Sequence, residues 1–95
     1  MSKFKIVPTK QYRKNYKRLQ KSGYDVLKLE TVIDMLAAGT PLPDRYRDHM
    51  LHGASRGTRA CHISPDWLLQ YAKLEDSLIL LLIQTGTHRD VLNIE

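Results

Sequence analysis

Four histidines fall in the second half of the chain, in regions where loops or strand ends are predicted: His49, His52, His62 and His88. An imidazole has an unperturbed pKa near 6.5, so it can both accept and donate a proton at neutral pH. General acid–base catalysis by such a group typically contributes a factor of about 10² to 10⁴ in rate. Two imidazoles gathered with a carboxylate on a concave sheet would form a site able to cleave a phosphodiester bond.

A carboxylate lies close to one of these histidines. His62 and Asp66 flank a predicted tight turn at Pro65, which would bring both side chains to the same end of a sheet. Taken alone, the pair is equally well explained by Asp66 capping the turn and His62 being a partly buried strand residue. We therefore treat the two residues as candidates for acid–base chemistry and keep the structural role as the alternative.

A metal site is a competing use of the same residue types. His49, His52, Cys61 and His62 supply nitrogen and sulfur donors, and a structural zinc site needs four ligands. Their spacing fits no compact zinc motif, so we predict no metal and no cofactor. Cys61 is expected to be a small strand residue packed toward the core. Because it is the single cysteine, it excludes an internal disulfide and suits a reducing compartment.

Two arginines, Arg56 and Arg59, bracket Gly57 at the entrance to a predicted strand. A guanidinium group binds phosphate oxygens at two points and stabilises a developing dianion, although a solvated surface position is the common fate of a single arginine. Trp67 is expected to anchor the core rather than stack on a base, because its strand continues into apolar residues. For Tyr71, a core position and a role in the site stay open.

The elements that must position these groups begin with a strand, since Lys3 to Val7 alternates basic and apolar residues. Thr9 is the predicted N-cap of an amphipathic helix that ends near Gly23. Asp25 is predicted to cap a second helix that ends near Gly39, so that the two helices form a hairpin. The first helix exposes six basic residues: Lys10, Arg13, Lys14, Lys17, Arg18 and Lys21.

Residues 40–57 are predicted to be a long loop, and long loops in small domains are usually functional. Strands are predicted over residues 58–64, 67–74 and 78–85, joined by tight turns into an antiparallel meander, with a last short strand over residues 91–94. The expected fold is α+β: two N-terminal helices packed on a twisted antiparallel sheet of about four to five strands. Residues 1–95 are expected to form a single domain.

Composition and charge limit the possible functions. The chain has 95 residues, 42% hydrophobic and 26% charged, which is typical of a folded globular domain. The apolar run from Leu78 to Ile83 is too short to span a bilayer, and no export signal precedes the first strand, so we expect a cytoplasmic protein that does not engage a membrane. The net charge is +5, and residues 1–59 carry 13 basic and 5 acidic groups. This asymmetry favours a polyanion or an acidic protein as partner.

Three sequence blocks resemble a known family. They are Tyr46–Gly53 (YRDHMLHG), Arg59–Leu69 (RACHISPDWLL) and Thr85–His88 (TGTH). Their order and spacing are similar to those of the YafQ branch of the RelE/ParE toxin superfamily, and the likeness covers nearly the whole chain. It implies the RelE-like fold, the fold class already expected from the pattern of elements.

The resemblance implies a bacterial type II toxin that enters the A site of the 70S ribosome and cuts mRNA there without a metal. In that reaction the ribose 2′-OH attacks the adjacent phosphate, leaving a 2′,3′-cyclic phosphate and a 5′-OH. His49, His62, Asp66 and His88 match the catalytic positions of the family. His88 would be the general acid, His49 or Asp66 the base, and His62 an orienting or charge-stabilising group.

The partners implied by the resemblance are the ribosome, mRNA and an acidic antitoxin of the DinJ/RelB kind that silences the toxin. The basic residues of the first helix would then meet ribosomal RNA. The residues that would contact the substrate or its phosphate are Arg56, Arg59, Gln84 and Leu92.

Two of these positions depart from the family pattern. Gln84 stands where family members often have arginine, and Leu92 stands where they often have an aromatic residue. We therefore expect weaker transition-state stabilisation and weaker base stacking than the family pattern gives. The alternative function is a non-catalytic basic binding module or a ParE-like toxin with another target such as gyrase, which would have no need of His49, His62 and His88 together.

Overall fold

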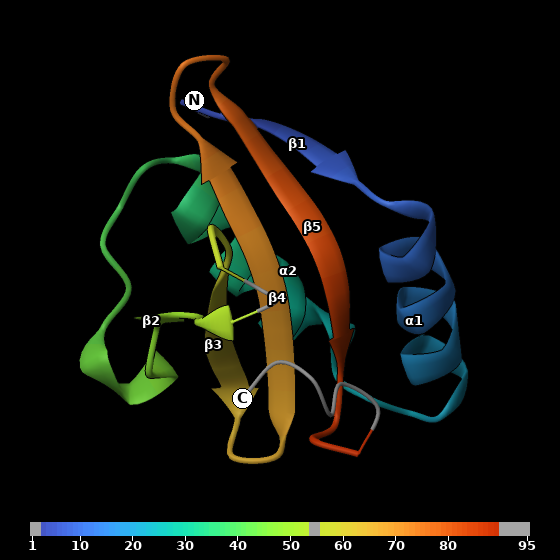
Figure 1. Cartoon of the computed structure of the whole chain (residues 1–95). Coiled ribbons are helices and arrows are strands. Elements are labelled where there is room, and N and C mark those ends of the chain that lie inside the picture. The colour runs from blue at the N-terminus through green and yellow to red at the C-terminus, as the bar shows by residue number, and fades with distance from the viewer. Residues whose placement is uncertain (1–2, 54–55, 90–95) are drawn as a thin grey trace.

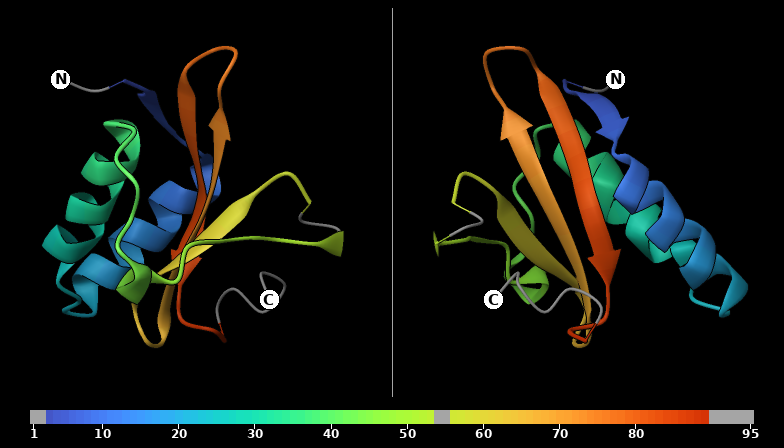
Figure 2. Two further views of the ribbon diagram at one scale, coloured as in Figure 1. Left: turned by 90° about the vertical axis from the view of Figure 1, so that its left-hand side faces the viewer. Right: turned by 45° about the vertical axis from the view of Figure 1, so that its right-hand side comes forward.

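The computed structural model of this chain describes residues 3–53 and 56–89. Its elements in chain order are β1 (Lys5–Pro8), α1 (Lys10–Lys21), α2 (Val26–Ala37), the 3-10 helix η1 (Asp44–Tyr46), β2 (His49–Met50), β3 (Arg59–Ser64), β4 (Trp67–Leu74) and β5 (Ile79–Gly86). Both helices lie against one face of a twisted sheet (Figure 1). Figure 2 shows that β2 projects on the other side. The predicted α+β class is confirmed.

The sheet has five strands in the order β1-β5-β4-β3-β2. The meander of β3, β4 and β5 is antiparallel as predicted, but β1 pairs with β5 in parallel, so the prediction of a wholly antiparallel sheet is wrong. The backbone N–H of Lys5 donates to the carbonyl of Leu78 at 2.8 Å, which places the start of β1 beside the start of β5. Alternation predicts that β1 is a strand, but it carries no information on the direction of a partner about 70 residues away.

Both helices begin at the predicted caps. The Thr9 hydroxyl accepts the N–H of Tyr12 at 3.1 Å, and an Asp25 carboxylate oxygen accepts the N–H of Leu27 at 3.2 Å. The six predicted basic residues of α1 are all exposed. The buried side of α1 includes one polar residue, Asn15, whose amide oxygen accepts the backbone N–H of Thr85 at 3.2 Å. This bond ties α1 to the end of β5 from which the chain continues to His88.

The core lies between the helices and the sheet. Leu29, Val32 and Leu36 of α2 pack in one cluster with Cys61 of β3 and Leu69 of β4, all at most 1% exposed. Burial of this apolar surface is the main term that holds the helices on the sheet. The predicted core position of Cys61 is confirmed.

Trp67 is also confirmed as a core anchor, because it is 3% exposed and its indole N–H donates to the Thr85 hydroxyl at 3.0 Å. That hydroxyl in turn donates to the carbonyl of Leu68 at 2.7 Å. The first residues of β4 and the last residues of β5 are therefore joined by side chains as well as by the strand ladder.

The segment predicted as a loop contains more structure than expected. Within residues 40–57 the chain forms η1 and then the two-residue strand β2, which pairs His49 with Ala60 and Met50 with Arg59. A strand of two residues has no detectable period, so the sequence pattern could not indicate it. The last short strand predicted over residues 91–94 lies outside the described residues.

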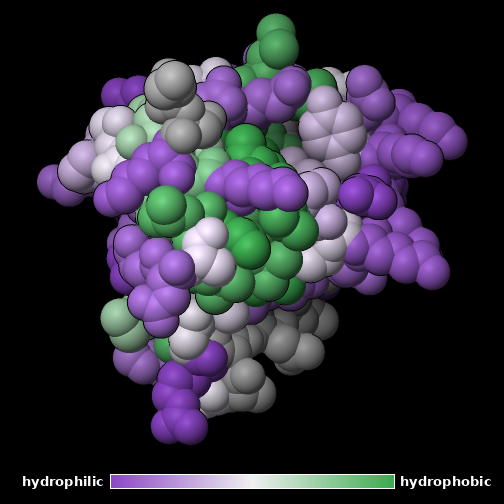
Figure 3. All heavy atoms as spheres, turned by 90° about the horizontal axis from the view of Figure 1, so that it is seen from above, coloured by the Kyte–Doolittle hydropathy of each residue, from purple (hydrophilic) through white to green (hydrophobic). Residues whose placement is uncertain are grey.

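Hydrophobic side chains are exposed at one end of the sheet. Viewed from above, a small group of hydrophobic residues is surrounded by hydrophilic ones (Figure 3). The turn between β4 and β5 lies at this upper end, where Leu74 and Leu78 are 43% and 45% exposed.

In the part of the chain that is described, no helix is long and apolar enough to cross a membrane.

Candidate active site

The register of the strands places the predicted site residues in rows across the sheet. His49 pairs with Ala60, Ala60 with Gln70, and Gln70 with Gln84. Residues that pair directly across strands point to the same face, so this row lies on one side of the sheet. His62 is two residues beyond Ala60 on β3 and therefore points to the same side. Because the residues between them, such as Cys61, lie in the core, the histidine side chains point away from the helices.

Three of the four histidines meet on this face. The ring centroids of His49 and His62 are 6.3 Å apart, and those of His62 and His88 are 5.6 Å apart. His49 comes from β2, His62 from β3 and His88 from the segment after β5, so the pairing of three strands creates the group. We call His49, His62, His88 and Asp66 the histidine cluster. His52 is exposed in the segment that follows β2.

The backbone orients two of the rings. Nδ1 of His49 lies 2.7 Å from the carbonyl oxygen of Arg47, and Nδ1 of His62 lies 3.3 Å from that of Pro65. A carbonyl oxygen only accepts, so in these bonds Nδ1 carries the proton. In the neutral ring Nε2 then has the lone pair, which is the form that a general base requires. Arg47 adopts a left-handed conformation (φ 48°) that is unusual for a residue other than glycine, and its carbonyl is the one that holds His49.

Asp66 holds the third ring. Its carboxylate accepts from the backbone N–H of His88 at 3.2 Å and lies 2.8 Å from Nδ1 of the same residue. These hydrogen bonds from His88 lower the pKa of Asp66 below its ordinary value, so the carboxylate is charged at neutral pH. An adjacent negative charge stabilises the protonated imidazole, the form that a general acid requires. The turn between β3 and β4 supplies Asp66, as predicted.

A second polar group lies on the opposite side of the sheet, toward the helices. The guanidinium of Arg59 is paired with the carboxylate of Asp48 at 3.1 Å, and the Tyr71 hydroxyl donates a short hydrogen bond to the same carboxylate. We call Asp48, Arg59 and Tyr71 the Asp48 network. Burial and the negative charge of Asp48 raise the pKa of Tyr71, and the bond to Asp48 raises that of Arg59.

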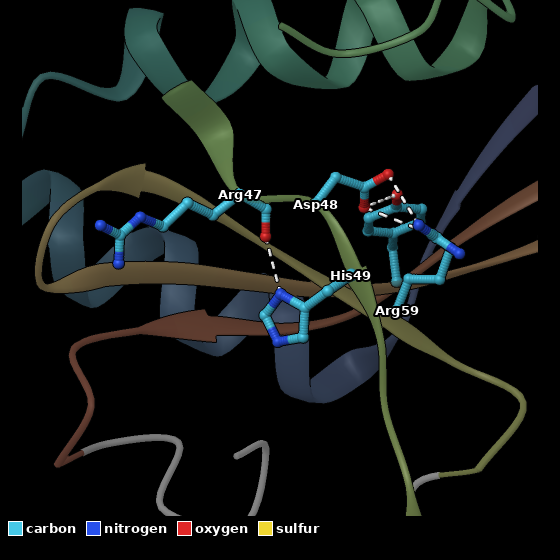
Figure 4. Close-up of polar contacts among 5 residues, drawn as sticks. Arg47, Asp48, His49 and Arg59 are labelled. Carbon is cyan, nitrogen blue, oxygen red and sulfur yellow. Dashed lines mark hydrogen bonds and ion pairs between the residues drawn. The ribbon is translucent and has the colours of Figure 1, made fainter. Parts of the chain in front are cut away.

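The two groups are joined through consecutive residues. Asp48 turns toward Arg59, whereas the His49 ring turns toward the carbonyl of Arg47 (Figure 4). Since Asp48 is fixed to β3 and β4 by side chains, the network holds the short strand that carries His49. Sequence reasoning missed Asp48. The signal was its place directly before His49, together with a tyrosine, Tyr71, in the middle of a strand.

The remaining predicted site residues are not members of the histidine cluster. The Gln84 amide donates to the Gln70 side chain at 2.7 Å, and Gln70 donates to the Thr58 hydroxyl at 3.0 Å. Arg56 is exposed in the segment between β2 and β3, where its backbone N–H donates to the carbonyl of Gly53. The charge of Arg59 is already paired with Asp48. Leu92 lies outside the described residues.

The candidate metal ligands differ in how deeply they are buried. Cys61 is fully buried, and burial raises the pKa of its thiol to about 12. Its side chain packs in the core with Leu29 and Leu69, on the face of the sheet opposite to the histidine side chains. Over residues 3–53 and 56–89, no three His, Cys, Asp or Glu side chains are arranged to hold a metal ion.

Comparisons with known proteins agree with this architecture. Residues 4–93 match the family described as "Bacterial toxin of type II toxin-antitoxin system, YafQ". The chain is 46% identical over 79 residues to the "mRNA interferase toxin YafQ" of Escherichia coli strain K12, covering 82% of this chain and 84% of that protein.

Solved structures give the same result. The crystal structure of YafQ from E. coli strain BL21(DE3) superposes with a TM-score of 0.88 at 33% identity, covering 95% of this chain and 99% of that one. YafQ in the crystal structure of the E. coli DinJ-YafQ toxin-antitoxin complex gives a TM-score of 0.87 at 35% identity, covering 96% and 99%. The chain therefore belongs to the YafQ family of bacterial toxins of type II toxin-antitoxin systems.

Proposed function

We propose that this protein is a metal-independent endoribonuclease that cleaves mRNA in the ribosomal A site. The observation that carries the proposal is the histidine cluster, in which three imidazoles and a carboxylate from separate segments of the chain meet on one face of the sheet. Imidazoles gathered in this way can supply both a base and an acid, which suits transfer of a phosphoryl group within RNA. The name of the E. coli relative, mRNA interferase, supports the same substrate.

In the proposed reaction, Nε2 of His49 takes the proton of the ribose 2′-OH, and the 2′-oxygen forms a bond to the adjacent phosphorus. The bond from phosphorus to the 5′-oxygen breaks, and His88 gives a proton to that oxygen. The products are a 2′,3′-cyclic phosphate and a 5′-OH. We assign the base to His49 rather than Asp66, because Asp66 is engaged by both N–H groups of His88.

His62 lies between the other two rings and would stabilise the charge that develops on the phosphate. Arg59 and Arg56 stay predictions as phosphate ligands. The pairing of Arg59 with Asp48 means that it would have to share its guanidinium between the carboxylate and the substrate.

The test uses ribosomes programmed with an mRNA in which the nucleotide before the scissile bond is ribose or 2′-deoxyribose. Cleavage of the ribose mRNA to a 5′-OH fragment, mapped by primer extension, is the expected result. The 2′-deoxy mRNA lacks the attacking hydroxyl and should stay intact. Cleavage of both at equal rates would exclude this mechanism, and cleavage of neither would exclude the activity.

We further propose that a cognate acidic antitoxin binds the exposed cations of α1, which the ribosomal RNA would otherwise contact. Lys14→Glu combined with Lys17→Glu should slow association with the antitoxin and flatten its dependence on salt, because both residues are exposed and basic. Lys5→Glu on β1 is the control, since it reverses a charge outside the helix. An association rate for the unmodified protein that does not vary with salt would remove the electrostatic basis of this proposal.

A further inference from the structure

A cavity of about 690 Å³ opens at the edge of the sheet beside the histidine cluster. It lies between α2, η1 and the last residues of β3, because β2 pairs only with the first two residues of β3 and leaves the rest of that edge open. Its volume falls in the range of about 300 to 1,000 Å³ that is usual for ligand sites. His62 lines it, so the cavity is continuous with the cluster.

The walls of this edge cleft are basic. Lys28 of α2 and Arg45 and Arg47 of the η1 segment contribute three cations, and the residues described as lining the cleft include no carboxylate. Two further cavities differ in this respect: one has Glu30 and Asp34 among its lining residues, and the other has Asp48 and Glu75. Of the three, the edge cleft is the one whose charge suits a polyanion.

The arginines of the cleft are held in different ways. The guanidinium of Arg45 lies 4.8 Å from the ring centre of Tyr46 and donates to its hydroxyl at 3.1 Å. Tyr46 itself packs against the core, so this stacked pair is fixed to the body of the protein. The guanidinium of Arg47 extends away from Asp48 and Arg59 (Figure 4). Neither arginine is therefore part of the Asp48 network.

We propose that the edge cleft binds the single-stranded RNA next to the scissile bond, with Lys28, Arg45 and Arg47 contacting its phosphates. The proposal rests on the proposed function, because His62 would join the cleft to the reacting phosphate. Guanidinium groups bind phosphate at two points, and the planar guanidinium of Arg45 also suits stacking on a base. None of these three cations was predicted as a site residue from the sequence, although Arg47 lies within the Tyr46–Gly53 block.

The first measurement is binding without cleavage. The probe is a short single-stranded RNA with 2′-O-methyl groups, titrated at several salt concentrations. The double variant Arg45→Ala/Arg47→Ala should bind about tenfold more weakly or worse, since hydrogen bonds to charged groups are lost. Its plot of log affinity against log salt should be flatter by about 1.4, the value for two phosphate contacts on a single strand. Arg45→Lys/Arg47→Lys should recover part of the loss.

The control is Lys5→Ala/Lys73→Ala, which removes the same charge from β1 and β4. Its affinity and salt slope should stay close to those of the unmodified protein. An equal loss in the control and in the arginine variant would show that only net charge matters, and the edge cleft would be excluded.

The second measurement is mRNA cleavage on programmed ribosomes, which separates this inference from the proposed function. If the unmodified protein cleaves and the arginine variant both cleaves and binds normally, the cleft is excluded while the proposed function stands. If the unmodified protein does not cleave but the arginine variant binds RNA more weakly than the control, the proposed function fails and RNA binding by the cleft stands.

Discussion

The two faces of the sheet around β2 and β3 carry polar groups that differ in burial and in how they are held. On one face, Asp66 and His88 are 71% and 44% exposed, and the rings of His49 and His62 are oriented by backbone carbonyls. On the other face, Tyr71 is 1% exposed and Asp48 and Arg59 bind each other. Asp66 and His88 are therefore open to a substrate, whereas Asp48 and Arg59 are half-buried beside the fully buried Tyr71 and bind one another.

The comparison predicts that variants of the two faces fail in different ways. Loss of a group in the histidine cluster should affect cleavage and leave stability nearly unchanged, because the lost contacts are exposed. Loss of a group in the Asp48 network should affect stability first and cleavage through the position of His49.

The largest effect is expected from the imidazoles. His62→Ala and His88→Ala should each lower single-turnover cleavage of mRNA on ribosomes by about 10² or more, the usual contribution of an acid or base. The free energy of unfolding, from urea titration, should change by less than about 0.5 kcal/mol. His52→Ala is the matched control and should cleave normally. Normal cleavage by both cluster variants would rule out the acid–base role.

A smaller loss, about 10- to 100-fold, is expected from Asp66→Asn, which keeps the shape of the side chain and removes its charge. Because the pKa of Asp66 is lowered, its carboxylate is negatively charged at neutral pH. Without that charge the protonated form of His88 is lost at lower pH, so the alkaline limb of the pH–rate profile should move to lower pH. A lower rate with an unmoved alkaline limb would mean that Asp66 acts through position alone.

Loss of a group in the Asp48 network should instead lower stability more than it lowers cleavage. Asp48→Asn leaves Arg59 without its anionic partner, and the pair is 35% and 24% exposed, so we expect a loss of about 1 to 2 kcal/mol in unfolding free energy. For a chain of this size that is a fall of roughly 4 to 16 °C in melting temperature. Cleavage should fall about tenfold at most, because His49 keeps its bond to Arg47. Asp76→Asn, in the exposed turn after β4, is the control.

Tyr71→Phe sharpens the same prediction, because it removes one hydroxyl and leaves Asp48 paired with Arg59. It should cost less stability than Asp48→Asn and should not alter the pH–rate profile. Full stability in both variants would show that the Asp48 network does not hold β2.

Much of this organisation is predictable from local sequence signals. Thr9 and Asp25 are helix caps, and the turn at Pro65 places Asp66 beside the end of β3, because such signals act over a few residues. The parallel pairing of β1 and the strand β2 were not predictable, because they depend on partners distant in the chain. For the same reason the structural role of Asp48 was not predicted, because it depends on a hydrogen bond from Tyr71, which is distant in the chain.

The smallest effect, and the one most particular to this chain, is expected at Gln84. This residue lies in the same row as His49, and its amide donates to Gln70 at 2.7 Å. An arginine there can keep that donation and add a positive charge on the face of the histidine cluster, and a cation near the developing dianion stabilises the transition state.

Gln84→Arg should therefore raise single-turnover cleavage about two- to tenfold, a part of the roughly 10²-fold that a full electrostatic contact supplies. Gln84→Met, similar in length and uncharged, should leave the rate unchanged or lower. If Gln84→Arg and Gln84→Met give the same rate, the charge at this position has no role in catalysis.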